Sequence, residues 1–300
     1  FNYAAGPIAW HNGGFGWAGP WADLDLDATI DGPATNAVAE GSLATSTLVP
    51  RGNRAVQTGQ WNRARRVLST SLRGVFDAAG LIEDRDAVWL VGRYGTSVYI
   101  SFLQRVTAVS DVFYGFELNR GDGNHNRVLS IGHGAEGTAY GVSSNTNGFI
   151  DPDIDYGDDR VCTPLFESLG DEDLETHLLV IRIDYGADHN DVATVYRDPV
   201  SLQDEQACRP SATLYGDFAF DRISLGNFNG EKGKVHEVDE IRVGASFRAV
   251  TGRRIVAEPE VANYGNPQPG RNCSTAALIV SSMTGGPIGS VWGSGMQLRE

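Results

Sequence analysis

The stretch L-L-V-I-R-I-D at residues 178–184 decides the fold class. In an extended chain Leu179, Ile181 and Ile183 fall on one face, while the residues between them fall on the other. A second run of the same kind, residues 192–197, follows after a polar segment. Two alternating runs joined by a short polar connection predict an antiparallel hairpin.

Similar runs extend outward from this hairpin, at residues 88–94, 98–106, 112–118, 127–131, 222–226 and 235–244. The first two are separated by Gly95-Thr96-Ser97, which predicts another hairpin. Glycine is frequent, at 37 residues, and helical periodicity is scarce. The pattern predicts an all-β, two-sheet antiparallel sandwich over residues 1–250. Residues 251–300 are rich in Gly, Pro and Ser and predict an extended C-terminal segment.

A basic cluster lies within residues 60–80, which are the best helix candidate or else a strand followed by a turn. It contains Arg63, Arg65, Arg66 and Arg73. Guanidinium groups at this density suit the carboxylates of an acidic glycan or of a protein partner. A solvated face with local ion pairs is the other interpretation, and the one that we favour.

The charge balance excludes several classes of partner. The chain has 38 acidic and 24 basic residues, a formal net charge of −14. Such a surface repels phosphate backbones and anionic lipids, so we expect neither nucleic-acid binding nor membrane insertion. No apolar run approaches the ~20 residues of a membrane helix. The acidic composition, with a start at Phe1 rather than Met, predicts a processed protein that is secreted to the cell surface or beyond.

The order of several segments indicates a family. They are F-N-Y-A-A-G and N-G-G-F-G-W at the start, residues 87–90 and 99–102, the hairpin of residues 178–199, and V-D-E-I-R-V-G at residues 238–244. This order resembles the laminin-G-like jelly roll of the concanavalin-A-like lectin/glucanase superfamily, in a version common in secreted proteins of planctomycete-type bacteria. The resemblance covers about residues 1–250 and implies a jelly-roll sandwich. It implies function only loosely, because this fold carries lectins, glycosidases, lyases and adhesion modules.

Three tryptophans near the start are candidate ligand-binding residues. Trp10, Trp17 and Trp21 lie among closely spaced glycines. Glycines permit tight turns, and exposed indole rings can stack on a sugar. The alternative is that the three rings are packed in the core.

The closing strand argues against one class of enzyme. Residues 237–242 read E-V-D-E-I-R, which resembles the E-x-D-x-x-E motif of glucanases except that Arg242 replaces its last glutamate. Retaining glycosidases need two carboxylates about 5–5.5 Å apart. We therefore predict no catalytic residues. A polysaccharide-degrading enzyme, either a glycosidase or a lyase with a Tyr/His/Arg set, is the alternative.

An acidic stretch predicts a structural calcium ion. Asp151, Asp153 and Asp155 alternate along the chain, and hard oxygen ligands in this arrangement suit Ca²⁺. The family resemblance adds Asp239 as a further ligand. A solvated acidic loop is the rival interpretation.

Two of the three cysteines are candidates for a disulfide. Cys162 and Cys208 flank a loop of about 45 residues, whose closure in an oxidising compartment would stabilise the fold. Cys273 is left over and is either a buried thiol or a link between chains. Three unpaired buried thiols are the alternative.

These observations favour a non-catalytic extracellular binding or structural module. In one version, exposed aromatic residues bind a glycan. In the other, the protein is a subunit of a surface layer or fibre. It then binds copies of itself or other extracellular proteins, with residues 251–300 as the connector.

Overall fold

The computed structural model describes residues 3–25, 36–48, 50–58, 62–85, 87–109, 113–121, 127–133, 140–144, 166–227 and 234–252. Most of the predicted C-terminal extension, together with Asp151, Asp153, Asp155, Cys162 and Cys273, therefore lies outside the described residues. Among the helices that the structure describes, none is long and apolar enough to cross a membrane.

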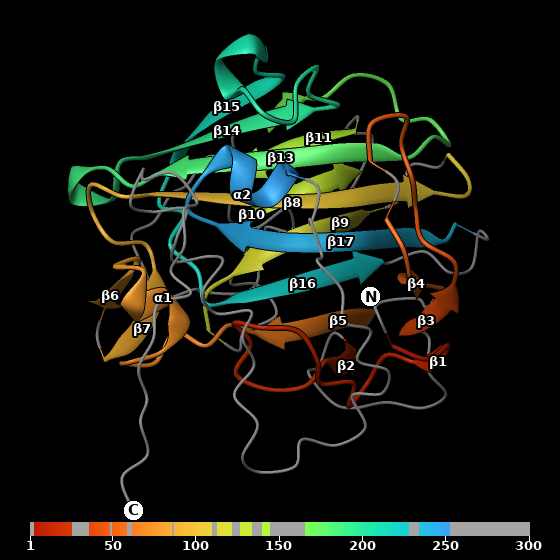
Figure 1. Ribbon diagram of the computed structural model, residues 1–300, viewed down its shortest axis with the longest axis horizontal. Coiled ribbons are helices and arrows are strands. Elements are labelled where there is room, and N and C mark those ends of the chain that lie inside the picture. The colour runs from red at the N-terminus through yellow and green to blue at the C-terminus, as the bar shows by residue number, and fades with distance from the viewer. Residues whose placement is uncertain are drawn as a thin grey trace, which may run out of the picture.

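Two antiparallel sheets form the body of the molecule (Figure 1). The eight-stranded sheet has the order β1 (Gly6–Pro7), β3 (Asn36–Glu40), β4 (Asn53–Gln57), β17 (His236–Gly244), β8 (Ser97–Val106), β13 (His177–Asp184), β14 (Asp191–Arg197) and β15 (Ala212–Gly216). The seven-stranded sheet has the order β12 (Phe166–Ser168), β11 (Tyr140–Ser144), β10 (Arg127–His133), β9 (Tyr114–Asn119), β16 (Arg222–Asn227), β5 (Asn62–Val67) and β2 (Ala22–Asp25). The predicted all-β, two-sheet antiparallel sandwich of the jelly-roll class is confirmed.

The remaining elements are short. A separate two-stranded sheet joins β6 (Ile82–Arg85) and β7 (Val88–Val91). The helices are α1 (Val75–Ala78), α2 (Phe247–Thr251) and the 3₁₀ turns η1 (Ala187–His189) and η2 (Glu205–Ala207). In Figure 1, α2 lies over the face that β8 and β13 present.

The main core lies between the two sheets, where alternate residues of each strand point inward. Phe102 of β8 and Phe116 of β9 stack across the interface with ring centroids 3.8 Å apart. A second apolar cluster lies on the outer face of the eight-stranded sheet. There Phe247 of α2 packs edge-on against Tyr99 and Tyr196, at centroid distances of 6.5 and 5.8 Å. The eight-stranded sheet is thus apolar on both faces, which explains the near-continuous apolar runs of β8 and β13.

The hairpin predicted for residues 178–197 is present, but the hairpin predicted for residues 88–106 is wrong. Strands β13 and β14 pair in antiparallel register, with Ile181 opposite Val195. Residues 88–94 and 98–106 do not pair with each other, because β7 pairs with β6 and β8 lies between β17 and β13. The reason is burial: β8 is a ten-residue strand buried on both faces, so it requires long partners on either side.

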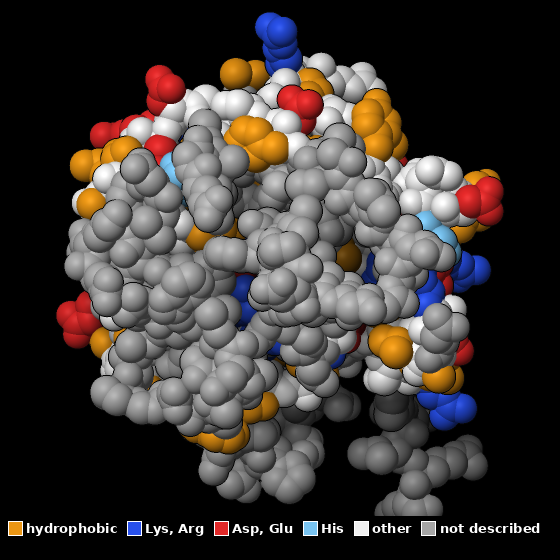
Figure 2. All heavy atoms as spheres, turned by 180° about the vertical axis from the view of Figure 1, so that it is seen from behind, with side chains coloured by type: hydrophobic (Ala, Val, Ile, Leu, Met, Phe, Trp, Pro, Cys, Tyr) orange, Lys and Arg blue, Asp and Glu red, His pale blue; other side chains and the backbone are white. Residues whose placement is uncertain are grey.

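Of the two alternatives for residues 60–80, the described residues 62–80 form the strand followed by a turn, not the long helix. Strand β5 is followed by a turn and the single-turn helix α1. The predicted local ion pairs exist, since Glu117 of β9 lies 2.7 Å from Arg63 and 3.2 Å from Arg127. The predicted solvated face is wrong for Arg63, Arg65 and Arg66, which are all buried. From the side opposite to Figure 1, Lys and Arg side chains are visible near the middle of the molecule and at one edge (Figure 2).

Candidate functional site

Arg66 organises the glycine- and tryptophan-rich segment at the start of the chain. Its guanidinium group donates hydrogen bonds of 2.9 Å to the Gly19 carbonyl, the Tyr3 hydroxyl and the Asn12 side-chain oxygen. The same group lies over the Trp17 ring, 4.6 Å from its centroid. One buried side chain of β5 therefore ties three separate points of residues 3–19 and fixes the position of Trp17.

The Trp17 ring lines an open groove between this segment and the turn that follows β5. The backbone N–H of Ser69 donates to the Gly16 carbonyl at 2.9 Å, and Trp17 forms a bridge with Leu68. The groove has a volume of about 440 Å³ and is lined by Phe15, Trp17, Arg73 and glycines of both segments. This volume lies within the range of small-molecule sites.

The backbone of the groove requires glycine at two positions. Gly14 and Gly16 have φ of 81° and 89°, a left-handed conformation that disfavours any residue with a Cβ. They flank Phe15 in the chain, and Gly16 alone separates Phe15 from Trp17. The result is two rings beside accessible backbone, which is a suitable surface for a flat, hydroxyl-rich ligand.

The three predicted tryptophans have different environments. Trp17 is partly buried and lines the groove. Trp10 is 71% exposed but does not line the groove. Trp21 is only 2% exposed and packs 6.0 Å from the Trp17 ring, so its proposed stacking on a sugar is wrong and the packing alternative holds.

One residue of the groove, Phe15, is 36% exposed and is not among the predicted ligand-binding residues. Another, Arg73, belongs to the basic cluster, for which an acidic glycan was the interpretation not favoured. The signal for Phe15 is its place in G-G-F-G-W, close to Trp17 in a glycine-rich segment; the bends at residues 14–16 mean that strand alternation does not account for the two rings lining one groove. No local pattern indicates that Arg73 would lie across from them.

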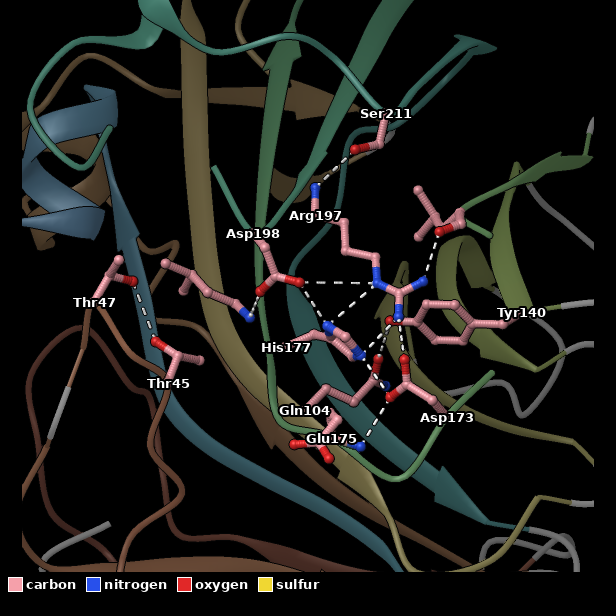
Figure 3. Close-up of polar contacts among 12 residues, drawn as sticks. Thr45, Thr47, Gln104, Tyr140, Asp173, Glu175, His177, Arg197, Asp198 and Ser211 are labelled. Atoms are coloured by element: carbon pink, nitrogen blue, oxygen red, sulfur yellow. Dashed lines mark hydrogen bonds and ion pairs between the residues drawn. The ribbon is translucent and has the colours of Figure 1, made fainter. Parts of the chain in front are cut away.

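A second polar cluster lies at one end of the sandwich, where β13 and β11 begin and β14 ends (Figure 3). His177 lies 2.6 Å from Asp198 and 2.8 Å from Asp173. Arg197 donates to the other Asp173 oxygen at 2.9 Å and to the carbonyl of Leu169 at 2.8 Å. A protonated His177 donates one N–H to each carboxylate. Burial alone would lower the pKa of His177, but its hydrogen bonds to Asp198 and Asp173 raise it above the usual value.

Tyr140 completes this cluster but directs its hydroxyl into the core. The Arg197 guanidinium lies 5.1 Å from the Tyr140 ring centroid, while the Tyr140 hydroxyl donates to Gln104 at 3.0 Å. The amide N–H of Gln104 then donates to His236 at 3.0 Å, and His236 donates to Gln57 at 2.6 Å. Burial raises the pKa of Tyr140 and lowers the pKa of His236 to about 3. Burial thus keeps His236 neutral and Tyr140 protonated near neutral pH.

A buried ion pair is a third group of charged residues in this part of the core. The ammonium group of Lys234 lies 2.6 Å from Glu172 and 4.4 Å from the centroid of the Tyr114 ring. Glu172 also lies 3.7 Å from His133. Charged groups at this depth are stable only when paired, which indicates a structural role for the pair.

The carboxylates of the closing strand are engaged in structural contacts. Glu237 is buried between Arg54 at 2.7 Å and Arg105 at 2.5 Å. Asp239 accepts the backbone N–H groups of Leu43 at 3.1 Å and Glu240 at 2.8 Å. Burial raises the pKa of Asp239. Both carboxylates fasten β17 to its neighbours.

The metal and disulfide predictions fall mostly outside the described residues. Asp151, Asp153 and Asp155 are not among them, so calcium binding stays a prediction. Within the described part of the chain, no three His, Cys, Asp or Glu side chains are grouped to hold a metal ion. Cys208 is a free, buried thiol with its sulfur 3.3 Å from the Ser201 carbonyl, which does not support the predicted Cys162–Cys208 disulfide. Cys162 itself lies outside the described residues.

Comparison with known proteins finds no matching protein-family profile and no matching curated protein. Several solved structures are similar, and three of them illustrate the range. The endo-β-1,4-glucuronan lyase of the fungus Trichoderma reesei is 12% identical with a TM-score of 0.40, over 77% of this chain and 96% of the lyase. The alginate lyase AlgAT5 of polysaccharide lyase family 7 is 12% identical with a TM-score of 0.37, over 75% and 94%. The carbohydrate recognition domain of Emp47p is 14% identical with a TM-score of 0.35, over 74% and 94%. These values are too low to transfer function to this chain.

Proposed function

We propose that the protein is a non-catalytic carbohydrate-binding module and that the groove lined by Phe15 and Trp17 holds a sugar ring. One observation carries this proposal: two aromatic rings, neither of them fully buried, line the same open groove. The C–H faces of a sugar ring pack on such rings, and its hydroxyl groups hydrogen-bond to nearby polar groups. The glycines beside the rings leave backbone groups within reach of those hydroxyls.

The fixed position of Trp17 supports binding. A ring that is already held loses little conformational freedom when a ligand stacks on it, so more of the contact energy appears as affinity. Arg66 provides this restraint, because it covers Trp17 at 4.6 Å while its N–H groups are engaged with residues 3–19.

The absence of catalysis is part of the proposal and rests on how the candidate acids and bases are engaged. Glu237 is held by two arginines, and Asp239 accepts two backbone N–H groups. Tyr140 lies with His177 and Arg197, as a lyase would require, but its hydroxyl donates inward to Gln104. A phenol held protonated inside the core is unsuited to remove a proton from a bound polysaccharide. We place the module outside the cell, as its acidic composition suggests.

A glycan array tests the proposal, with the protein compared against its Phe15→Ala and Trp17→Ala variants. Tyr215→Ala is the matched control, because Tyr215 is an exposed aromatic residue (64%) on the edge strand β15. We expect the wild type and the control to bind the same glycans, and both groove variants to lose at least about tenfold in affinity. Phe15→Ala is the decisive variant, since Phe15 lies outside the packed core. Wild-type affinity in Phe15→Ala, or no glycan bound by the wild type, would contradict the proposal.

A further inference from the structure

We infer that the sugar held in this groove carries an anionic group and that Arg73 recognises it; this inference rests on the proposed function. Arg73 lies on the turn after β5 and lines the same groove as Phe15 and Trp17. An arginine that lines the same groove as two aromatic rings adds a charged, two-pronged donor to a surface on which a sugar ring can stack. That combination suits a sugar ring with a carboxylate or sulfate substituent.

The side chain of Arg73 is available, unlike that of its neighbour Arg66. Arg66 is buried, and its N–H groups are engaged with Gly19, Tyr3 and Asn12. Arg73 is exposed, and among the described residues no carboxylate lies within ion-pair distance of its guanidinium group. The nearby Asp77 accepts the backbone N–H of Arg73 at 2.7 Å. Among the described residues, the Arg73 side chain thus has no competing carboxylate where it lines the groove.

The backbone at Arg73 is held in an unusual conformation. Its φ is 65°, in the left-handed region that is unfavourable for a residue with a Cβ. The turn fixes this conformation, because Gly74 donates to the Ser71 carbonyl at 2.9 Å and Asp77 holds the Arg73 amide. A glycine would fit this position without strain. An arginine here is therefore consistent with a use for its side chain.

The net charge of the whole chain makes a local positive group necessary for an anionic ligand. With a net charge of −14, the protein repels anionic polymers in general. An anionic sugar would therefore need a local positive group that contacts it directly. Arg73 supplies one at the groove, and salt should weaken its contribution because the side chain is exposed.

The test is calorimetric titration with oligosaccharides of equal length that are neutral, carboxylated or sulfated. We expect either the carboxylated or the sulfated oligosaccharides to bind the wild type roughly fivefold to tenfold more tightly than the neutral ones. This difference in affinity should be smaller at high salt. The more tightly bound series identifies the substituent. In Arg73→Gln the ratio of anionic to neutral affinity should fall to about one. Arg73→Lys should keep part of the preference, since it retains the charge.

Arg209→Gln is the matched control, because Arg209 is an exposed arginine on the loop before β15. It should keep the wild-type ratio. Equal binding of neutral and anionic oligosaccharides by the wild type, or an unchanged ratio in Arg73→Gln, would overturn the inference. Those results would leave the proposed function standing if binding still depends on Phe15. No binding of any oligosaccharide, or binding independent of Phe15, would instead contradict the proposed function itself.

Discussion

The guanidinium carbon of Arg66 lies 4.6 Å from the centroid of the Trp17 ring. This contact joins the seven-stranded sheet to the groove, because Arg66 belongs to β5 and Trp17 lines the groove. Cation–π contacts of this kind are strongest when the cation is removed from water, and Arg66 is buried. The position of the groove therefore depends on a residue that does not line it.

Replacing Arg66 by Lys should lower the free energy of unfolding by about 2 kcal/mol, because an ammonium group cannot reproduce three directed hydrogen bonds and a planar stacking contact. Glycan affinity should fall as well, because Trp17 loses its support. Urea unfolding and calorimetric titration measure the two effects. Arg209→Gln serves as the control and should change neither. A loss of stability below about 0.5 kcal/mol would show that Arg66 does not organise the segment.

The stability that His177 contributes should depend on pH. The pKa of His177 is raised in the folded protein, so the folded state binds this proton more tightly than the unfolded state does. Its contribution is therefore complete below the unfolded pKa of about 6.5 and is lost as the pH rises through the folded value. His177→Gln should cost more stability near about pH 5.5 than near about pH 8.5. Thermal melts at the two pH values measure this, and an equal loss at both would refute the assignment.

His236 should make the protein less stable, not more stable, as the pH falls. Burial holds the pKa of His236 at about 3, so between about pH 6.5 and pH 3 the unfolded state binds a proton that the folded state does not. Each pH unit below about 6.5 then costs up to about 1.4 kcal/mol of stability. A His236→Gln variant has a lower stability at neutral pH but should lose less of it on acidification. Parallel stability curves for the two proteins between about pH 7 and pH 4 would contradict a neutral buried His236.

The stretches that form strands could be predicted from the sequence. The strand with which each one pairs could be predicted only where two consecutive strands form a hairpin. The alternation in residues 178–197 is local, and β13 and β14 pair as expected. Strand β8 pairs instead with β17, more than a hundred residues away, because both faces of β8 are covered. Periodicity shows that a strand exists and which side chains share a face. It carries no information on which distant strand completes the sheet.

The candidate site could be predicted in part. Trp17, from the Gly- and Trp-rich segment, lines the groove, and its role in ligand binding stays a prediction. Packing in the core was the alternative for all three tryptophans, and it holds for Trp21, but composition does not tell which ring of a cluster faces the core. The role of Arg66 depends on contacts with residues 3, 12 and 19, far from it in the chain. The four arginines of one basic cluster thus have different roles, and only the three-dimensional contacts separate them.

The groove can be located directly by amide chemical-shift mapping of the labelled protein during titration with a glycan that it binds. The account predicts that the largest shifts fall in residues 14–17 and 69–78, the two segments that line the groove, and that they vanish in Phe15→Ala. The amides around Tyr215 on β15 should stay unchanged. Shifts centred on any other part of the protein, or shifts that persist in Phe15→Ala, would contradict the claim that this groove is the glycan-binding site.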